Sequence, residues 1–181
     1  MLHKVTIAGL TMDPASNTPI IILKSEKEDH TIPIWIGLLE ATSIASALQK
    51  IEFDRPMTHD LFKNVAERFK TDVTRIEICD LKENTFFARI YFESGDISFD
   101  IDARPSDAIA IALRFGAPIF VDDKVVQHSK SGEAQPEVLD ESEEGKKWAE
   151  YLKNLSPEDF GKYKVYFFSP SDLREKNCFR F

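Results

Sequence analysis

The 181-residue sequence has few cysteines, no long apolar run and a shortage of basic side chains. Its two cysteines, Cys79 and Cys178, form no CxxC pair and no zinc-binding spacing, so we expect free thiols in a reducing compartment. No apolar stretch approaches the ~20 residues that cross a bilayer, and the first residues lack the pattern of a signal peptide. These absences predict a cytoplasmic protein that does not enter the membrane.

The charge balance limits the possible partners. Basic residues number 23 and acidic residues 31, which leaves a net charge of −8. A surface of this sign repels phosphate backbones, so bulk charge disfavours non-specific binding of nucleic acid. Any nucleic-acid chemistry would need a local basic patch or bound cations. The sequence also contains no P-loop, GxSxG, GxGxxG or HExxH signature.

The residue pattern that is present predicts an α+β domain. Alternating and β-branched runs indicate strands, and apolar residues spaced three and four apart indicate helices. Strands are expected near residues 4–7 and at 19–23, 31–36, 72–79, 86–92, 97–101 and 117–121. Helices are expected at 38–51, from an N-cap at Thr58 with Leu61, Val65 and Phe69 on one stripe, and from Arg104 to a C-cap at Gly116. We therefore predict a mixed, largely antiparallel sheet with three packed helices.

The composition changes after about residue 128, where we place the end of this domain. Six acids and no base lie between Glu133 and Glu144, so residues 129–144 are expected to form a solvated linker. Residues 145–181 are expected to form a helical extension, whose Trp148, Tyr151, Leu152 and Leu155 stripe needs a surface to dock on, and a tail. The basic and aromatic tail from Lys162 could bind single strands, but a packed or loose terminus is the favoured interpretation.

Two segments share a pattern that suits anion binding. Arg55-Pro56-Met57-Thr58-His59-Asp60 and Arg104-Pro105-Ser106-Asp107 each put Arg-Pro, a hydroxyl residue and Asp at a helix N-terminus. The helix start offers free N–H groups and partial positive charge, and arginine adds a bidentate fork for phosphate. The sequence thus predicts Arg55, Arg104, Thr58 and Ser106 as substrate-binding residues. The alternative is ordinary capping, with each arginine paired to its own aspartate.

Other residues could supply proton transfer or metal binding. His59 can act as a general base or acid near neutral pH. Asp100 and Asp102 project from one face of a predicted strand, where carboxylates could hold a divalent cation, and Asp102 is preferred because it adjoins the second Arg-Pro turn. Glu40 would join the site only if the start of its helix faces the two turns. The alternative for the strand is an ordinary solvated face.

Several motifs in combination resemble one family. They are Pro33-Ile34-Trp35-Ile36-Gly37 with Glu40-Ala41, the Arg55 to Leu61 segment, and Asp102-Ala103-Arg104-Pro105-Ser106-Asp107 with Leu113-Arg114. Together they resemble the bifunctional nuclease domain family over about residues 2–128, and residues 144–164 resemble an extension seen in many bacterial members. The resemblance implies an α+β domain and cleavage of both DNA and RNA.

The resulting hypothesis is a metal-dependent nuclease that hydrolyses phosphodiester bonds of DNA and RNA. Asp102, Asp107 and Glu40 would hold Mg²⁺ or Mn²⁺, and His59, Asp60, Asp102 and Asp107 are the expected catalytic residues. The alternative is a non-catalytic, oligomeric binding or regulatory module with an anion-binding pocket. The 14 phenylalanines are a large apolar load, so we expect a homo-oligomer, most simply a dimer.

Overall fold

The computed structural model describes residues 1–13, 16–27 and 30–130. Within this part of the chain one seven-stranded sheet and four helices confirm the predicted α+β class. Only the first two residues of the predicted linker, 129 and 130, are among the described residues. The rest of the linker and the predicted helical extension lie outside them. The elements are β1 (Leu2–Met12), β2 (Pro19–Ser25), β3 (Thr31–Trp35), α1 (Leu38–Leu48), α2 (Thr58–Arg68), β4 (Asp72–Lys82), β5 (Thr85–Ser94), β6 (Ile97–Ala103), α3 (Pro105–Phe115), β7 (Ile119–Asp122) and α4 (Asp123–Lys130).

The sheet consists of two antiparallel halves that β7 joins. Its strand order is β3-β2-β1-β7-β4-β5-β6. β7 pairs antiparallel with β1 and parallel with β4, whereas all other neighbours are antiparallel. The sheet is therefore mixed and largely antiparallel, as the sequence predicts.

The turns follow from the residues at their tips. Glu83 and Asn84 have φ values of 47° and 62° between β4 and β5, and Gly95 has a φ of 59° between β5 and β6. Tight hairpins therefore connect β4 to β5 and β5 to β6, which agrees with the predicted antiparallel pairing. Gly116 ends α3 in the left-handed region at φ 69°, a conformation that glycine adopts without a steric penalty. That prediction is confirmed as well.

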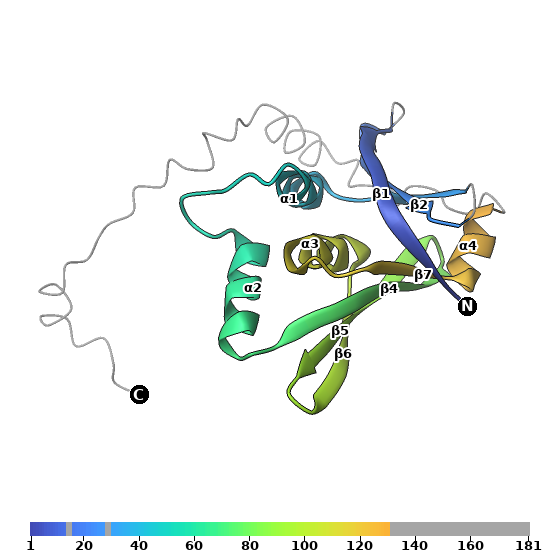
Figure 1. Cartoon of the computed structure of the whole chain (residues 1–181). Coiled ribbons are helices and arrows are strands. Elements are labelled where there is room, and N and C mark those ends of the chain that lie inside the picture. Colours follow the sequence, from blue (N-terminus) through green and yellow to red (C-terminus); the bar gives the residue numbers. More distant parts are fainter. Residues whose placement is uncertain (14–15, 28–29, 131–181) are drawn as a thin grey trace, which may run out of the picture.

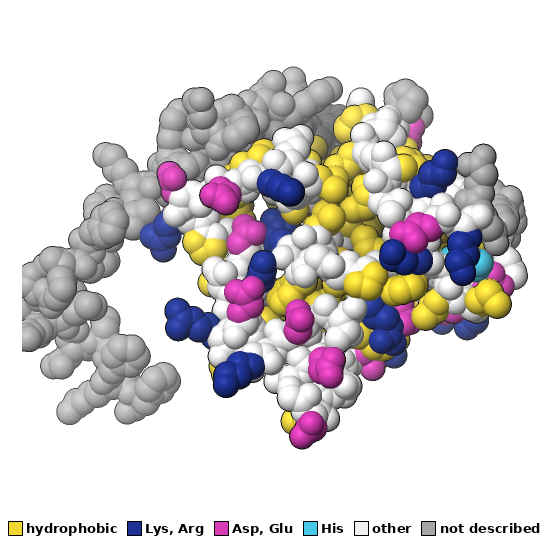
Figure 2. Space-filling model, in the orientation of Figure 1, with side chains coloured by type: hydrophobic (Ala, Val, Ile, Leu, Met, Phe, Trp, Pro, Cys, Tyr) yellow, Lys and Arg dark blue, Asp and Glu magenta, His cyan; other side chains and the backbone are white. Residues whose placement is uncertain are grey.

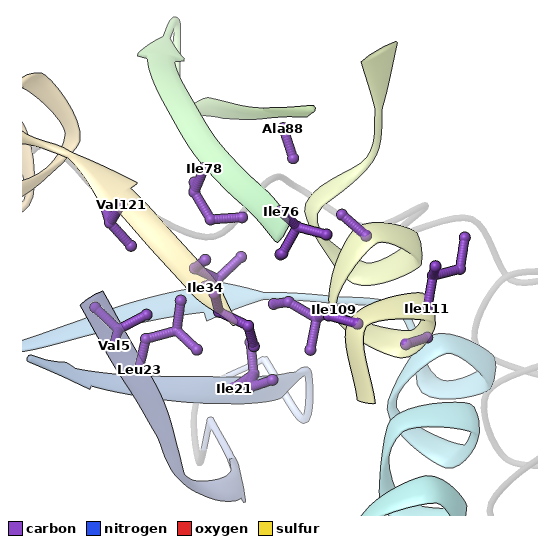
Figure 3. Packing of buried hydrophobic residues seen from close by; sticks show 14 of the residues in the cluster. Val5, Ile21, Leu23, Ile34, Ile76, Ile78, Ala88, Ile109, Ile111 and Val121 are labelled. Carbon is purple, nitrogen blue, oxygen red and sulfur yellow. The ribbon is translucent and has the colours of Figure 1, made fainter. Parts of the chain in front are cut away.

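The core is rich in isoleucine and is centred on α3. This helix packs against β4, β5 and α1, and α1 runs beside it while α2 lies near the ends of both (Figure 1). Figure 3 shows Ile109 of α3 among strand side chains from both halves of the sheet, including Ile21, Ile34 and Ile76. All four of these isoleucines are fully buried. Since each half contributes, α3 is the element that holds the two halves to one core.

The helices differ from the prediction in three respects. α1 ends at Leu48 rather than at residue 51, and α4 was not predicted. The N-cap of α2 is Met57 and not Thr58, because the Asp60 carboxylate accepts the Met57 N–H and supplies the cap from within the helix. No described helix is long and apolar enough to cross a membrane.

The stripe predicted along α2 is also exposed. Leu61, Val65 and Phe69 keep 54%, 47% and 74% of their surface, and Ala66 is the buried residue of this helix. On the neighbouring edge strand β6, Ile97 is likewise 66% exposed. The described residues thus leave an apolar surface over α2 and β6, which we call the α2–β6 surface.

Candidate functional site

Three helices bring a serine, a histidine and an aspartate into one chain of hydrogen bonds. His59, in the first turn of α2, has its Nε2 atom 3.1 Å from Asp107 Oδ1 in the first turn of α3. Its Nδ1 atom lies 2.9 Å from Ser43 Oγ on α1. The two Arg-Pro helix starts are therefore neighbours, as their shared chemistry predicts.

The protonation state of Asp107 sets the direction of these bonds. Burial alone would raise the pKa of this carboxyl, but hydrogen bonds from Arg104 and His59 outweigh burial and hold the pKa below its usual value. An ionised carboxylate only accepts, so His59 must donate from Nε2. In a neutral imidazole Nδ1 then carries a lone pair, and the Ser43 hydroxyl donates to it.

Arg104 binds Asp107 on the side that His59 does not occupy, and it also binds Glu40. Its Nε and Nη2 atoms donate to both oxygens of Asp107 at 2.7 and 3.1 Å, and its Nη1 donates to Glu40 Oε1 at 2.8 Å. These bonds, led by that to Asp107, raise the pKa of the guanidinium. The side chain nevertheless keeps 65% of its surface exposed. Arg104 is therefore a cation that an anion from solvent can reach.

A cavity of about 280 Å³ lies beside Arg104. Its polar wall contains Glu40, Arg104 and Ser106, and its apolar wall contains Trp35 and Phe86. Lys and Arg side chains are interspersed with Asp and Glu over the face seen in Figure 2. Among the described residues that line the cavity, Arg104 is the only Lys or Arg.

Asp60 serves the structure more than the His59 group. Asp60 Oδ1 accepts a 2.5 Å hydrogen bond from Arg114 Nε, and the Arg114 side chain is only 7% exposed. Arg114 also donates to the carbonyls of Ser43 and Ala110, so it ties α1, α2 and α3 together. Thr58 and Arg55 are exposed, and within the described residues neither makes a side-chain hydrogen bond or ion pair.

Asp102 lies on the opposite face of the sheet. Phe99 of β6 stacks on Phe92, which contacts Phe62 of α2, so the odd-numbered residues of β6 face the helices. Because side chains alternate along a strand, Asp102 points to the other face, opposite Arg89. Arg89 forms its ion pair with Asp100 instead. The structure does not bring Asp102 to the His59 group.

The carboxylates expected to hold a metal do not assemble a site as they stand. Glu40 and Asp107 both bind Arg104, whose guanidinium lies between them, and Asp102 is on the far face. Among the described residues, no group of three or more His, Cys, Asp or Glu side chains is arranged to hold a metal ion. The predicted ligand set and this structure therefore do not fit each other.

Sequence reasoning missed two residues of this region, Ser43 and Arg114. Ser43 looks like any polar position of a helix, although its spacing of three from Glu40 puts both residues on one face of α1. Arg114 was seen only as part of a motif. The signal that would have found it is a charged side chain among the residues of α3 that follow Asp107, which are otherwise apolar.

Comparison with known proteins agrees with the motifs. Residues 21–133 match the family model described as the bifunctional nuclease domain. An uncharacterized protein of Mycobacterium tuberculosis is 36% identical over 166 residues, which cover 88% of this chain and 98% of that protein. Bifunctional nuclease 1 of Arabidopsis thaliana is 29% identical and that of Oryza sativa subsp. japonica 25% identical, over 66% and 68% of this chain. Both alignments cover 38% of the plant protein.

Proposed function

Because the chain belongs to the bifunctional nuclease domain family, we propose that it is a nuclease that hydrolyses phosphodiester bonds of DNA and RNA. The observation that carries the proposal is the pairing of a proton-transfer group with an accessible cation. His59 is held between Ser43 and Asp107, and Arg104, bonded to the same Asp107, stands at the solvent edge. These two functions side by side can support phosphodiester hydrolysis.

Each residue then has a defined role. Arg104 binds the scissile phosphate and offsets the negative charge that builds up on its oxygens in the transition state. Since Glu40 and Asp107 already bind this guanidinium, they hold it at the edge of the cavity. His59 accepts the proton of the attacking oxygen at Nδ1 and returns a proton to the leaving oxygen, while Asp107 stabilises the imidazolium.

Metal dependence forms a separate part of the proposal. A divalent cation, when bound, would neutralise phosphate charge, and Mg²⁺ or Mn²⁺ is the expected ion. The described carboxylates do not form its site, so the roles above do not pass through it. Cleavage measured in EDTA and after addition of Mg²⁺ or Mn²⁺ to the His59→Ala and wild-type proteins tests this part.

The test of the activity compares three purified proteins on single-stranded DNA and RNA oligonucleotides. His59→Ala should lower the cleavage rate by about 10²-fold or more, because it removes the proton-transfer group. Asp102→Asn is the matched control, since its side chain lies on the opposite face of the sheet. Thermal melts establish that all three proteins are folded. Equal cleavage by the wild type and His59→Ala would identify a contaminant and overturn the proposal.

One observation favours a different class of function. Arg104 is already bonded to two carboxylates, which is the arrangement of a structural ion-pair network in a non-catalytic binding module. In such a module Arg104→Ala would weaken binding of inorganic phosphate or lower the melting temperature, and no variant would change a cleavage rate. Wild-type protein without any His59-dependent cleavage would favour this alternative.

We also propose a cytoplasmic location. Cys79 is a free, partly buried thiol, and burial raises its pKa, which makes the thiol less reactive. A free thiol of this kind suits a reducing compartment. Fractionation of cells that produce the protein, with detection in the cytosolic or another fraction, checks the location.

A further inference from the structure

We propose that Ser43 is the nucleophile of this site and that cleavage passes through a covalent phosphoserine intermediate. The substrate in this inference rests on the proposed function, whereas the activated serine rests on geometry alone. An activated nucleophile is recognised by a base within hydrogen-bond reach that is itself oriented by a third group. Ser43, His59 and Asp107 satisfy both conditions, at 2.9 and 3.1 Å.

The Ser43 hydroxyl behaves unlike its neighbours on α1. Thr42 Oγ1 donates to the carbonyl of Leu38, and Ser46 Oγ donates to the carbonyl of Ser43, which are the ordinary bonds of hydroxyl residues in a helix. Ser43 Oγ instead meets an imidazole from a residue 16 positions later, on another helix. The hydroxyl is thus aimed at a base rather than at its own backbone.

The imidazole is fixed in the form that activates a hydroxyl. Asp107, kept ionised by Arg104, accepts from Nε2 and leaves the basic lone pair on Nδ1, where Ser43 donates. Without Asp107 either ring nitrogen could carry the proton. In the tautomer with the proton on Nδ1, His59 would be a donor toward Ser43 and could not act as its base. The ion pair of Arg104 and Asp107 therefore prepares His59 as a base toward Ser43.

The phosphate-binding cation lies on the Ser43 side of α1. Glu40 and Ser43 are three residues apart, so they share one face of this helix. Glu40 binds Arg104, and Ser43 binds His59, while Asp107 binds both Arg104 and His59. These contacts form a continuous series of side chains from Glu40 to Ser43, and both ends of the series are on α1. A phosphate held by Arg104 is consequently presented to the same series of side chains that contains the serine.

The chemistry balances in two transfers. Ser43 Oγ forms a bond to phosphorus as the bond from phosphorus to the leaving ribose or deoxyribose oxygen breaks, and the serine proton passes to His59 Nδ1 and on to that oxygen. Water then attacks the phosphoserine, gives a proton to His59 and restores the Ser43 hydroxyl as the nucleic-acid phosphate leaves. No oxidant, reductant or further reactant is consumed.

A fluorophosphonate probe tests the serine without any assumption about the substrate. An activated serine displaces fluoride from phosphorus, and the label is located by peptide mass spectrometry. The full chain should be labelled at Ser43, and His59→Ala should slow labelling at least tenfold. Thr42→Ala removes a neighbouring, exposed hydroxyl of the same helix and should be labelled at the wild-type rate. A folded wild-type protein without label at Ser43 would overturn the inference.

Oligonucleotide cleavage supplies the second measurement. Residues that act as a unit are not additive, so Ser43→Ala, His59→Ala and the double variant should each lose about the same factor, on the order of 10²-fold or more. Full cleavage by Ser43→Ala would overturn the inference and leave the proposed nuclease intact, with water as the direct nucleophile. Labelling of Ser43 in a protein that cleaves no nucleic acid would overturn the proposed function and support the activated serine.

Discussion

Glu40 folds back over Gly37 at the start of α1, and its carboxylate occupies the space that a Cβ atom on Gly37 would need. Gly37 is the N-cap of this helix, and its backbone is in an ordinary extended conformation. The requirement for glycine at this position is therefore one of space rather than of backbone freedom. It allows Glu40 to lie where Arg104 can reach it.

Gly37→Ala should consequently act through Glu40. The new methyl group displaces the carboxylate from Arg104, so Gly37→Ala and Glu40→Gln should each lower the free energy of unfolding by about 1 kcal/mol or less, as for an exposed ion pair. The double variant should have the same free energy of unfolding as the less stable of the two single variants, because both changes remove the same contact. Urea unfolding of the four proteins measures this coupling, and additive losses would contradict it.

Substitution of Asp107 and substitution of Asp102 should have different effects on the cleavage rate. Asp107→Asn removes the acceptor that fixes His59, and we expect a loss on the order of 10²-fold. Asp102→Asn should leave the rate within about twofold, since it alters a side chain on the opposite face of the sheet. Initial rates on one oligonucleotide, with circular dichroism as the folding control, decide between them. A severe loss in Asp102→Asn would return this residue to the active site.

The ion pair of Asp107 should give the protein an acid-sensitive contribution to stability. The pKa of Asp107 is depressed in the folded state, so its contribution is fully present above the unfolded value of about 3.9 and is lost as the pH falls through the folded value. The difference in unfolding free energy between the wild type and Asp107→Asn should shrink as the pH falls below about 4. Urea titrations on both sides of this pH measure it, and a difference that grows below about pH 4 would contradict the assigned direction.

The Asp60–Arg114 pair should respond unequally to loss of either partner. Asp60→Ala leaves a guanidinium that is 7% exposed without its carboxylate, which typically costs on the order of 3 kcal/mol. Arg114→Met leaves a carboxylate that is 33% exposed and that water can reach, so the electrostatic penalty is smaller. Chemical denaturation gives both values. Cleavage per folded molecule should stay within a few-fold for Asp60→Ala, and a loss comparable to that of His59→Ala would instead assign Asp60 to the chemistry.

The α2–β6 surface should bury itself against a second copy of the chain. Leu61, Val65, Phe69 and Ile97 are large apolar side chains that stay exposed on these two elements, and gathered exposed apolar side chains mark interaction sites. We expect light scattering to give twice the mass of one chain for the wild type and the mass of one chain for Val65→Glu. Lys24→Glu introduces the same charge on β2 and should leave the dimer intact. A wild type that is monomeric over a wide concentration range would contradict the expected homo-oligomer.

The parts of this molecule that local sequence determines were predictable. Asn84, Gly95 and Gly116 mark conformations that few other residues adopt, so both hairpins and the end of α3 follow from them. The orientation of α2 was not predictable, because Leu61, Val65 and Phe69 form as regular a stripe as a buried helix would show. Only the packing of Ala66 and Phe62 toward the sheet reveals which side is covered.

The sequence predicts the types of residue at the site better than it predicts which individual residues come together there. His59 and Asp107 followed from two similar helix starts. Asp102 was included because it lies at the end of a predicted strand beside the second Arg-Pro turn, but the alternation of side chains along β6 puts its carboxylate on the other face of the sheet. Ser43 was missed because its partner belongs to another helix, and no local pattern distinguishes a serine that meets a histidine from one that meets water.

The short strand β7 affects the order in which the sheet can be completed during synthesis. β1 and β4 are joined only through residues Ile119–Asp122, among the last of the described domain to be synthesised. Each three-stranded half can form once its own strands are complete. Until β7 pairs with them, however, β1 and β4 are unpaired sheet edges, which are templates for pairing with other chains. A chain that ends before residue 119 would therefore leave both edges unpaired at once, and the four residues of β7 are what covers them.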